Sequence, residues 1–419
     1  MSRRKRKDKR KRKPKSKSRR SIVKSNDTGM PRFEIKLGMI PAGYAMSACK
    51  PGEQVEIVLR EFRSSEDGDL FISRLEGFPM QLLNLIRQKY KTVIWESDIS
   101  NMVAIIRKDK SATVFINAPS LAKIQVKNPR PIKAGTPINR NDISDIQEMI
   151  FKGVNIPVDV GVFVIFSAGW RRGLYYDLAP LAPDLPDRNY DINLLLGGYY
   201  SYLLFRDRFK LSDSDWEDLF KSQWFPFASL SDKSINDIIA HNNYGWNVDD
   251  LLHQIKAEVV ERTPDMFKFW VNIEAFKPHM KFFHEAFEQY KEDKDISCIS
   301  VLYPRIEGAL RTFQSLMGKP RQANQKDLAD TIISDYVNPK HKVYSPLLPL
   351  KFNKYLSEYY FANFDPTIED NPLSRNTVCH GVASEEIFCL KASTLGFLIL
   401  SQLAYYFSGI GGAKEEDSK

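Results

Sequence analysis

The sequence predicts an α+β multidomain protein with a mixed α/β N-terminal region, a helical middle region and a C-terminal all-α helical bundle. Three observations support this prediction. Short runs with a two-residue apolar period, typical of strands, occur up to about residue 180, and helical periodicity follows from about residue 189. The chain of 419 residues, 43% of them hydrophobic, is also longer than one core usually serves.

Changes in charge and periodicity divide the chain. We expect residues 1–31 to be a disordered basic tail and residues 32–185 an α+β domain of unknown role. Residues 186–293 are expected to form a mostly helical middle region, residues 294–408 a helical domain, and residues 409–419 a disordered C-terminal tail. The sequence has no repeat of fixed period, which argues against a solenoid.

The N-terminal tail concentrates the positive charge. Its first twenty residues hold fourteen of the 61 Lys and Arg residues and one of the 52 acidic residues, so the rest holds 47 basic (61−14) and 51 acidic (52−1) residues. The tail can be a solubilising extension, a phosphate-binding arm for RNA or DNA, or a nuclear-import-like signal. The candidate phosphate-binding residues are Arg3, Arg4, Lys5, Arg6, Arg10, Lys11, Arg12, Lys13, Arg19 and Arg20.

Several classes of protein are disfavoured by composition. The four cysteines have no CxxC spacing and no neighbouring histidine cluster, so we expect no metal site and no disulfide framework. The sequence has no phosphate-binding glycine loop of an ATPase or a dinucleotide enzyme, and we expect no cofactor. The longest apolar stretch is too short to span a bilayer, so we expect a protein that is neither secreted nor in contact with a membrane. The cysteine usage fits a reducing compartment, and we expect a cytoplasmic location.

The α+β region has recognisable elements. Strands are predicted at residues 33–37, 55–59, 113–116 and 159–166, and a helix is predicted at residues 79–90. The strand at 159–166 is rich in β-branched and aromatic residues, as in a buried strand. Two glycines in the following segment, 167–173, predict a turn, after which the apolar residues 174–176 can return as the second strand of a hairpin.

Residues 130–143 are locally similar to the turn–strand–turn phrase of SAF-type β-clip domains. The alternative is an ordinary glycine turn followed by an Asn/Asp helix cap.

The helical part is punctuated by caps and prolines. Ser212 is predicted to cap one helix, Thr263-Pro264 to open a second, and Asp295 to cap a third that ends at Gly318. A fourth is predicted from Lys351 to Phe361. Prolines 278 and 304 are expected to kink or divide two helices. Trp170, Trp216 and Trp224 can line a ligand cleft, but we expect core positions for them.

One C-terminal segment, residues 375–381 (RNTVCHG), carries groups suited to RNA cleavage without a metal. That reaction needs groups that move protons and a fixed cation for the charge that builds on the phosphorane. Histidine titrates near neutral pH, and arginine stays charged and grips two phosphate oxygens, so His380 and Arg375 are the candidates. A spacing of five residues puts them about 140° apart on a continuous helix, so they converge only with help.

Local signals predict a helix boundary beside this pair. Asn371-Pro372 is predicted as the cap and first helical residue, and Gly381 as the end of the helix. Ser384-Glu385-Glu386 is predicted to start a long terminal helix. Arg375 and His380 would then lie on a short helix and its exit turn.

Arg375-Asn376, three intervening residues and His380-Gly381, followed by a long apolar helix, resemble the Arg-polar-x-x-x-His motif of the HEPN superfamily. The resemblance covers about the last quarter of the chain. Residues 303–311 (YPRIEGALR) are similar to a phrase on an earlier helix of several HEPN groups, where an acidic residue can face the motif.

The resemblance implies an all-α bundle, a homodimer whose two motifs form one composite site, and RNA cleavage that needs no metal and leaves a 2′,3′-cyclic phosphate. It implies His380 as general acid/base, Arg375 as phosphate clamp and Asn376 as the group that orients the substrate or the histidine. Glu307 and Arg311 are supporting candidates. It also implies RNA as partner, a prokaryotic defence or toxin setting, and an unknown trigger or inhibitor.

Structural interpretations of the same residues stay open. Arg375 can bind acidic groups of the bundle, and His380 can satisfy a carbonyl at a helix end. The domain would then be a non-catalytic HEPN-like module that dimerises or binds RNA or nucleotide. Glu307 and Arg311 are expected to form a surface ion pair, because they lie four residues apart on a helix. Cys379 is expected to be a small buried residue.

Overall fold

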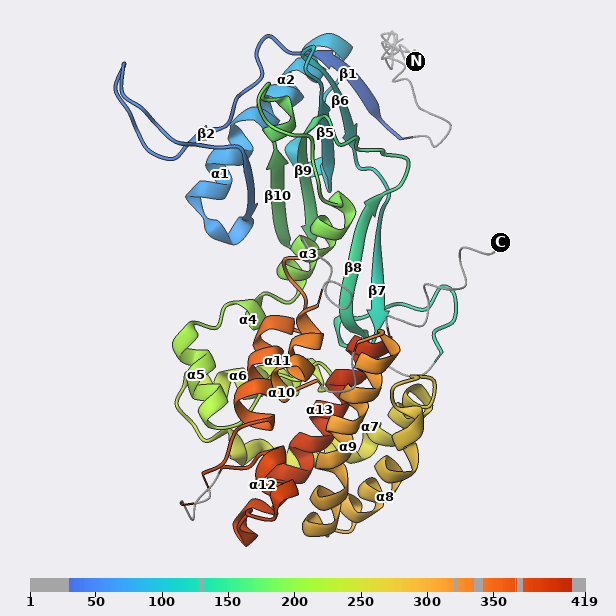
Figure 1. Cartoon of the computed structure of the whole chain (residues 1–419). Helices are drawn as coiled ribbons and strands as arrows, with labels where there is room; N and C mark the ends of the chain where they lie inside the picture. Colours follow the sequence, from blue (N-terminus) through green and yellow to red (C-terminus); the bar gives the residue numbers. More distant parts are fainter. Residues whose placement is uncertain are drawn as a thin grey trace, which may run out of the picture.

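The computed structural model is a mixed α/β fold, with an antiparallel sheet in the N-terminal part and helices in the middle and C-terminal parts (Figure 1). In the described part of the chain, no helix combines the length and the apolar character needed to cross a membrane. The expected tail residues from Arg3 to Arg20, the segment 409–419 and Asn371 lie outside the described residues. The structure describes residues 30–127, 131–319, 323–334, 342–365, 367 and 372–408.

Six antiparallel strands form the main sheet in the order β1-β6-β5-β9-β10-β4. The predicted strands at 33–37, 113–116 and 159–166 are confirmed, and the predicted hairpin pairs β9 with β10. The strands are β1 (Arg32–Lys36), β4 (Arg60–Ser64), β5 (Met102–Ile106), β6 (Ser111–Ile116), β9 (Gly161–Ala168) and β10 (Arg171–Asp177).

Both faces of the sheet are covered. Helices α1 (Asp69–Glu76) and α2 (Phe78–Tyr90) lie on one face, and the predicted helix at α2 is confirmed. Helix α3 (Ile192–Leu204) lies on the other. Because side chains alternate along a strand, Ala104 of β5 lies in the core that the sheet forms with α1 and α2. Its neighbour Val103 lies in the core that the sheet forms with α3.

Two strands differ from the prediction. Of the strand expected at 55–59, only β3 (Ile57–Val58) forms, paired with β2 (Tyr44–Ala45) outside the main sheet. The edge strand β4 was not predicted. Its sequence, REFRS, buries only Ser64, so it lacks the apolar alternation on which strand prediction depends.

A two-stranded ribbon connects the sheet to the helices (Figure 1). It consists of β7 (Ser120–Val126) and β8 (Ile143–Phe151), with two register irregularities. Near its far end, the Gln125 Nε2 atom donates a hydrogen bond to the Tyr405 carbonyl at 2.8 Å, and the Tyr405 hydroxyl donates to the Lys127 carbonyl at 3.1 Å. The ribbon therefore contacts the C-terminal helix directly.

The described part of the segment that resembles a β-clip phrase, residues 131–143, begins with a turn at Gly135, whose φ is +84°. Asn139 then caps the 3-10 helix η3 (Arg140–Asp142), and no strand lies between turn and helix. This is the alternative geometry, a glycine turn followed by an Asn cap.

Helices dominate from Ile192 to Ser408, as predicted from periodicity. Ser212 caps α5 as predicted and accepts the Asp215 N–H at 3.2 Å. The helix predicted from Lys351 to Phe361 is confirmed as α11 followed by a π-helical turn, η8 (Leu356–Tyr360). The helices are α4 (Arg206–Phe209), α5 (Asp213–Lys221), α6 (Asp232–Asn243), α7 (Leu252–Trp270), α8 (Met280–Lys291), α9 (Asp295–Leu316), α10 (Gln325–Asp330), α11 (Pro349–Tyr355), α12 (Arg375–His380) and α13 (Leu390–Ser408).

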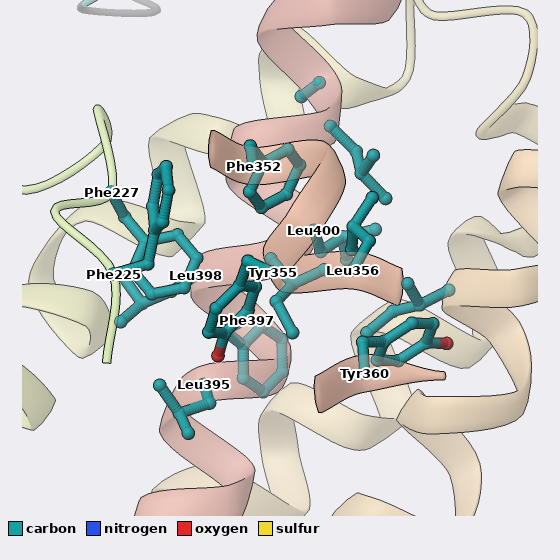
Figure 2. Packing of buried hydrophobic residues seen from close by; sticks show 14 of the residues in the cluster. Phe225, Phe227, Phe352, Tyr355, Leu356, Tyr360, Leu395, Phe397, Leu398 and Leu400 are labelled. Atoms are coloured by element: carbon teal, nitrogen blue, oxygen red, sulfur yellow. The ribbon is translucent and has the colours of Figure 1, made fainter. Parts of the chain in front are cut away.

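One apolar core runs through the helical part, from Trp216 to Phe407. Figure 2 shows Phe225 and Phe227, from the loop after α5, beside Phe352 and Tyr355 of α11 and residues of α13. Every residue of α13 from Ala392 to Phe407 is buried. Residues 216–293 therefore share one core with the expected region 294–408, whereas α3 belongs to a core of the sheet.

Two prolines that were expected to begin or interrupt a helix lie inside continuous helices. Thr263-Pro264 does not open a helix, because α7 passes through it. The apolar stripe of α7 continues on both sides, and the missing proline N–H leaves one carbonyl of the preceding turn without its helical donor. Pro304 likewise lies inside α9, which is not divided there, whereas Pro278 lies in η6 (Lys277–His279), between α7 and α8.

Two further helix starts and one tryptophan differ from expectation. Asp295 is the first helical residue of α9 rather than its cap. Ser384 precedes the 3-10 helix η9 (Glu385–Ile387), and α13 begins only at Leu390. Trp170 is 74% exposed because it occupies the tight turn between β9 and β10, whereas Trp216 and Trp224 are buried as expected.

Candidate active site

Helix α12 carries the predicted motif and is fixed at both ends by its own sequence. Ser374 is the N-cap, and its hydroxyl accepts the Thr377 N–H at 3.1 Å. The expected start at Pro372 is therefore wrong by three residues. Gly381 ends the helix as predicted, in the left-handed conformation (φ +68°) that glycine adopts without strain. Arg375 and His380 are thus the first and last residues of one short helix.

The Arg375 side chain points toward α9. Its guanidinium forms an ion pair with the Glu307 carboxylate, and its Nη1 atom donates to the Asn376 Oδ1 atom at 3.1 Å. Its side chain remains 22% exposed, whereas that of Glu307 is 5% exposed. A buried carboxylate therefore holds a cation at the protein surface.

Glu307 also binds the second supporting candidate, Arg311. The Arg311 Nε atom donates to the Glu307 Oε1 atom at 2.7 Å, and Arg311 Nη1 donates to the Ala323 carbonyl at 2.9 Å. The expectation of a surface ion pair is wrong in one respect, because the carboxylate is buried and shared by two guanidiniums. Together the three groups carry one net positive charge.

Asn376 is buried and fully engaged. Its Nδ2 atom donates to the Phe361 and Ala362 carbonyls at 3.1 and 3.2 Å, and its amide exchanges two hydrogen bonds with the Gln325 amide. The described contacts of Asn376 do not include His380. The residue therefore anchors α12 to α10 and to the chain after the π-helical turn, and it positions Arg375.

His380 faces solvent at the exit of α12. Its ring lies 5.2 Å from the ring of Phe364, at an interplanar angle of 40°. Among the described residues, no hydrogen bond or ion pair joins His380 to Arg375 or Asn376. The two candidate groups of one chain are thus close in sequence but lie against different neighbours.

Cys379 was expected to be buried, and it is exposed. Residues 375 and 379 are four apart and share a face of α12, so the thiol lies near the Arg375–Glu307 pair. Partial burial raises the pKa of Cys379, and the Arg375 charge opposes this shift. A raised pKa lowers the fraction of thiolate, which is the nucleophilic form. No three metal-binding side chains gather among the residues that the structure describes.

Comparisons of the chain with family models, with curated proteins and with solved structures found no match. What the arrangement can do therefore follows from its chemistry. An exposed imidazole can exchange protons with a bound ligand, and a partly exposed guanidinium fixed by a buried carboxylate can bind an anionic oxygen.

Two residues around the motif carry no recognisable sequence signal. Gln325 is the first residue of α10 and contacts Asn376 across a gap of fifty-one positions. Phe364 lies in the loop after the π-helical turn. Neither position belongs to a periodic pattern, so only the tertiary structure brings them to α12.

Proposed function

We propose that the chain is a metal-independent endoribonuclease of the HEPN type that acts in the cytoplasm, in a prokaryotic defence or toxin setting. The observation that carries this proposal is the arrangement on α12, where His380 lies in solvent and Arg375 is fixed by the buried Glu307 carboxylate. A cation and a titratable imidazole on one short surface helix are the groups that metal-free RNA cleavage requires.

In the proposed reaction, an imidazole nitrogen of His380 accepts the proton of the ribose 2′-hydroxyl. The 2′-oxygen forms a bond to phosphorus, and the bond from phosphorus to the 5′-oxygen breaks. The 5′-oxygen takes up a proton from an imidazolium or from water, which leaves a 2′,3′-cyclic phosphate and a 5′-hydroxyl. Arg375 stabilises the charge on the phosphorane oxygens.

The divergence of the two side chains bears on oligomeric state. Arg375 lies against Glu307 and His380 against Phe364, so one copy offers the two groups in different directions. A homodimer in which α12 helices face each other would supply a second His380 as proton donor. Dimerisation is therefore part of the proposal.

The deciding experiment is cleavage of single-stranded RNA by the full chain in the presence of EDTA, with the 3′ ends mapped for cyclic phosphate. His380→Ala should lower the rate by about a hundredfold or more. His253→Ala, at another exposed histidine on α7, is the matched control and should keep full activity. Equal cleavage by wild type and His380→Ala would overturn the catalytic assignment.

A second candidate function, a non-catalytic module for binding or dimerisation, is favoured by the engagement of Asn376 and Arg375 in structural contacts. In that case both His380→Ala and wild type would be inactive while RNA binding or dimerisation persisted. Substitution of Arg375 does not separate the two functions, because it removes a buried ion pair in either case.

A further inference from the structure

Trp170 is an exposed aromatic platform at the end of the main sheet. Its side chain is 74% exposed, in the turn between β9 and β10. The Arg171 guanidinium lies over the indole, 4.8 Å from the ring centroid. A large exposed indole with a cation packed on one face offers its other face to a planar group that can stack on it.

Cations gather next to this platform around a single carboxylate, that of Glu66. The Arg171 Nε atom lies 2.5 Å from Glu66 Oε1, Arg206 forms an ion pair with Glu66, and the Lys210 Nζ atom lies 3.4 Å from Glu66 Oε2. The neighbouring Asp67 carboxylate accepts the N–H of Ser64 as a cap. The three cations and the carboxylates of Glu66 and Asp67 together leave one net positive charge beside the indole, and Lys210, whose side chain is 49% exposed, is the most accessible of the three cations.

Lys210 also lines a hollow of about 500 Å³ between α4, α5 and α6. Its polar lining consists of the side chains of Asp207, Asp215, Asn236 and Asn243 in addition to Lys210. Amide and carboxylate groups can pair with base edges and ribose hydroxyls. The two carboxylates repel phosphate, so the phosphates of a bound strand would follow the Lys210 side.

A second aromatic platform closes the far end of the hollow. Tyr244, which also lines it, is 69% exposed, and Trp246 is 58% exposed. The two ring centroids lie 5.0 Å apart, and Gly245 between them has a φ of +68°. The turn therefore presents two aromatic rings to solvent.

We infer that the surface from Trp170 through Lys210 to Trp246, here called the aromatic–basic strip, binds single-stranded RNA. The strip is connected by successive contacts. Arg171 lies over Trp170 and binds Glu66, Glu66 binds Lys210, and Lys210 and Tyr244 line the same hollow. Aromatic rings that stack bases, with cations that bind the backbone, are the general means of holding a single strand. In a duplex the bases are stacked inside and cannot reach the rings.

This inference rests on the proposed ribonuclease function in naming the strip as a place where the substrate is held. It assigns a role to the region before the C-terminal helices, from which Trp170 and Trp246 both come. The strip also offers contacts with bases, which a basic tail that bound phosphate would lack.

The test uses the full chain with His380→Ala, so that bound RNA is not cleaved. Single-stranded oligouridine carrying iodouridine is crosslinked by ultraviolet light, which joins the base to aromatic side chains in contact. Crosslinked peptides are then identified by mass spectrometry. We expect crosslinks at Trp170 and at Tyr244 or Trp246, and their loss when a complementary strand is annealed.

Affinity is measured in parallel by fluorescence anisotropy of labelled oligouridine. Trp170→Ala should weaken binding by roughly five- to tenfold, the lower part of the range for one lost stack, because the other contacts of the strip remain. Trp95→Ala is the matched control, since Trp95 is 62% exposed but lies outside the strip. Trp170→Ala should fold normally, because the side chain is largely exposed.

The outcomes separate the two proposals. Crosslinks confined to residues 1–29 or to α12, or equal affinity of Trp170→Ala and Trp95→Ala, would overturn the strip as an RNA site. Crosslinks on the strip without cleavage by any variant would keep the strip and remove the ribonuclease function. Cleavage that depends on His380, without crosslinks on the strip, would keep the ribonuclease function and overturn the strip as an RNA site.

Discussion

Arg375 of α12 forms an ion pair with Glu307 of α9, whose side chain is only 5% exposed. The candidate active-site cation is thus held by the same contact that fixes α12 against the bundle. Substitutions here are expected to affect stability and activity together, and the two effects need separate measurements.

Arg375→Ala should lower the free energy of unfolding by about 1–3 kcal/mol, because it leaves the buried Glu307 carboxylate with Arg311 as its remaining cation. Urea unfolding measures this. Arg311→Ala is the control and should cost less, since the Arg311 side chain is 40% exposed. An Arg375→Ala variant as stable as wild type would contradict the pairing.

Asn376→Ala should also destabilise, by about 1–3 kcal/mol, because the Phe361 and Ala362 carbonyls lose their amide donor in a buried position. Gln325→Ala tests the other side of the amide pair. If the hydrogen bonds are made as described, the double variant should lose less stability than the sum of the single ones. Strict additivity would argue against the contact.

Gly197→Ala should separate α3 from the ribbon. A Cβ atom at this position would lie 2.8 Å from the Glu148 Cα atom and 2.9 Å from the Gln147 carbonyl oxygen, and backbone cannot move aside as a side chain can. We expect a loss of about 1–3 kcal/mol in thermal or urea unfolding. Gly38→Ala, where no atom lies within 4 Å, should change stability little.

Thiol reactivity should distinguish the four cysteines. Burial raises the pKa of Cys298 to about 12, whereas Cys49, Cys379 and Cys389 are exposed. Titration of the native protein with a disulfide reagent should therefore modify three thiols, and the fourth only after denaturation. Modification of all four at one rate in the native state would show that Cys298 is accessible.

Lys127 should make stability depend on pH. Burial lowers the pKa of its ammonium well below the ordinary value, and the charges of Arg208 and Arg262 lower it further, against the opposing effect of Asp232 and Glu258. The unfolded chain then binds more protons than the folded one between the folded-state and unfolded-state pKa values, so stability rises with pH through that interval. Below the folded-state pKa the buried ammonium of Lys127 is charged, and its desolvation lowers the free energy of unfolding by the full amount.

Lys127→Met removes this titration. Urea midpoints compared between about pH 7 and about pH 9 should rise less steeply in the variant than in wild type. At higher pH the buried tyrosines oppose folding, because their raised pKa values keep them protonated in the folded chain only. Identical pH profiles would mean that Lys127 is not desolvated.

Elements with strong local signals were predictable. The strand at 159–166 is rich in β-branched and aromatic residues, and Gly381 supplies the left-handed end of α12. Elements determined by distant contacts were not. The strand β4 is polar and forms because β10 offers it an edge, and α7 continues through Pro264 because its apolar face is buried on both sides.

The candidate site shows the same division. The sequence singles out Arg375 and His380 by type and spacing, and the similarity of residues 303–311 to a phrase in HEPN groups adds Glu307 as a supporting candidate. It does not show that Glu307 is buried, nor that Asn376 is taken up by Gln325, because both facts depend on how α9 and α10 pack against α12. The exposure of Trp170 likewise follows from the turn that it occupies.

The contact between the ribbon and the helices has a consequence for dissecting the protein. Asp145 of β8 is buried and binds Lys342 and Ser345, both from the chain before α11. If the chain were cut near residue 185, each fragment would be left with desolvated polar groups that only the other can satisfy. We therefore expect the separate halves to be poorly soluble, and to complement each other into a native-like complex when refolded together.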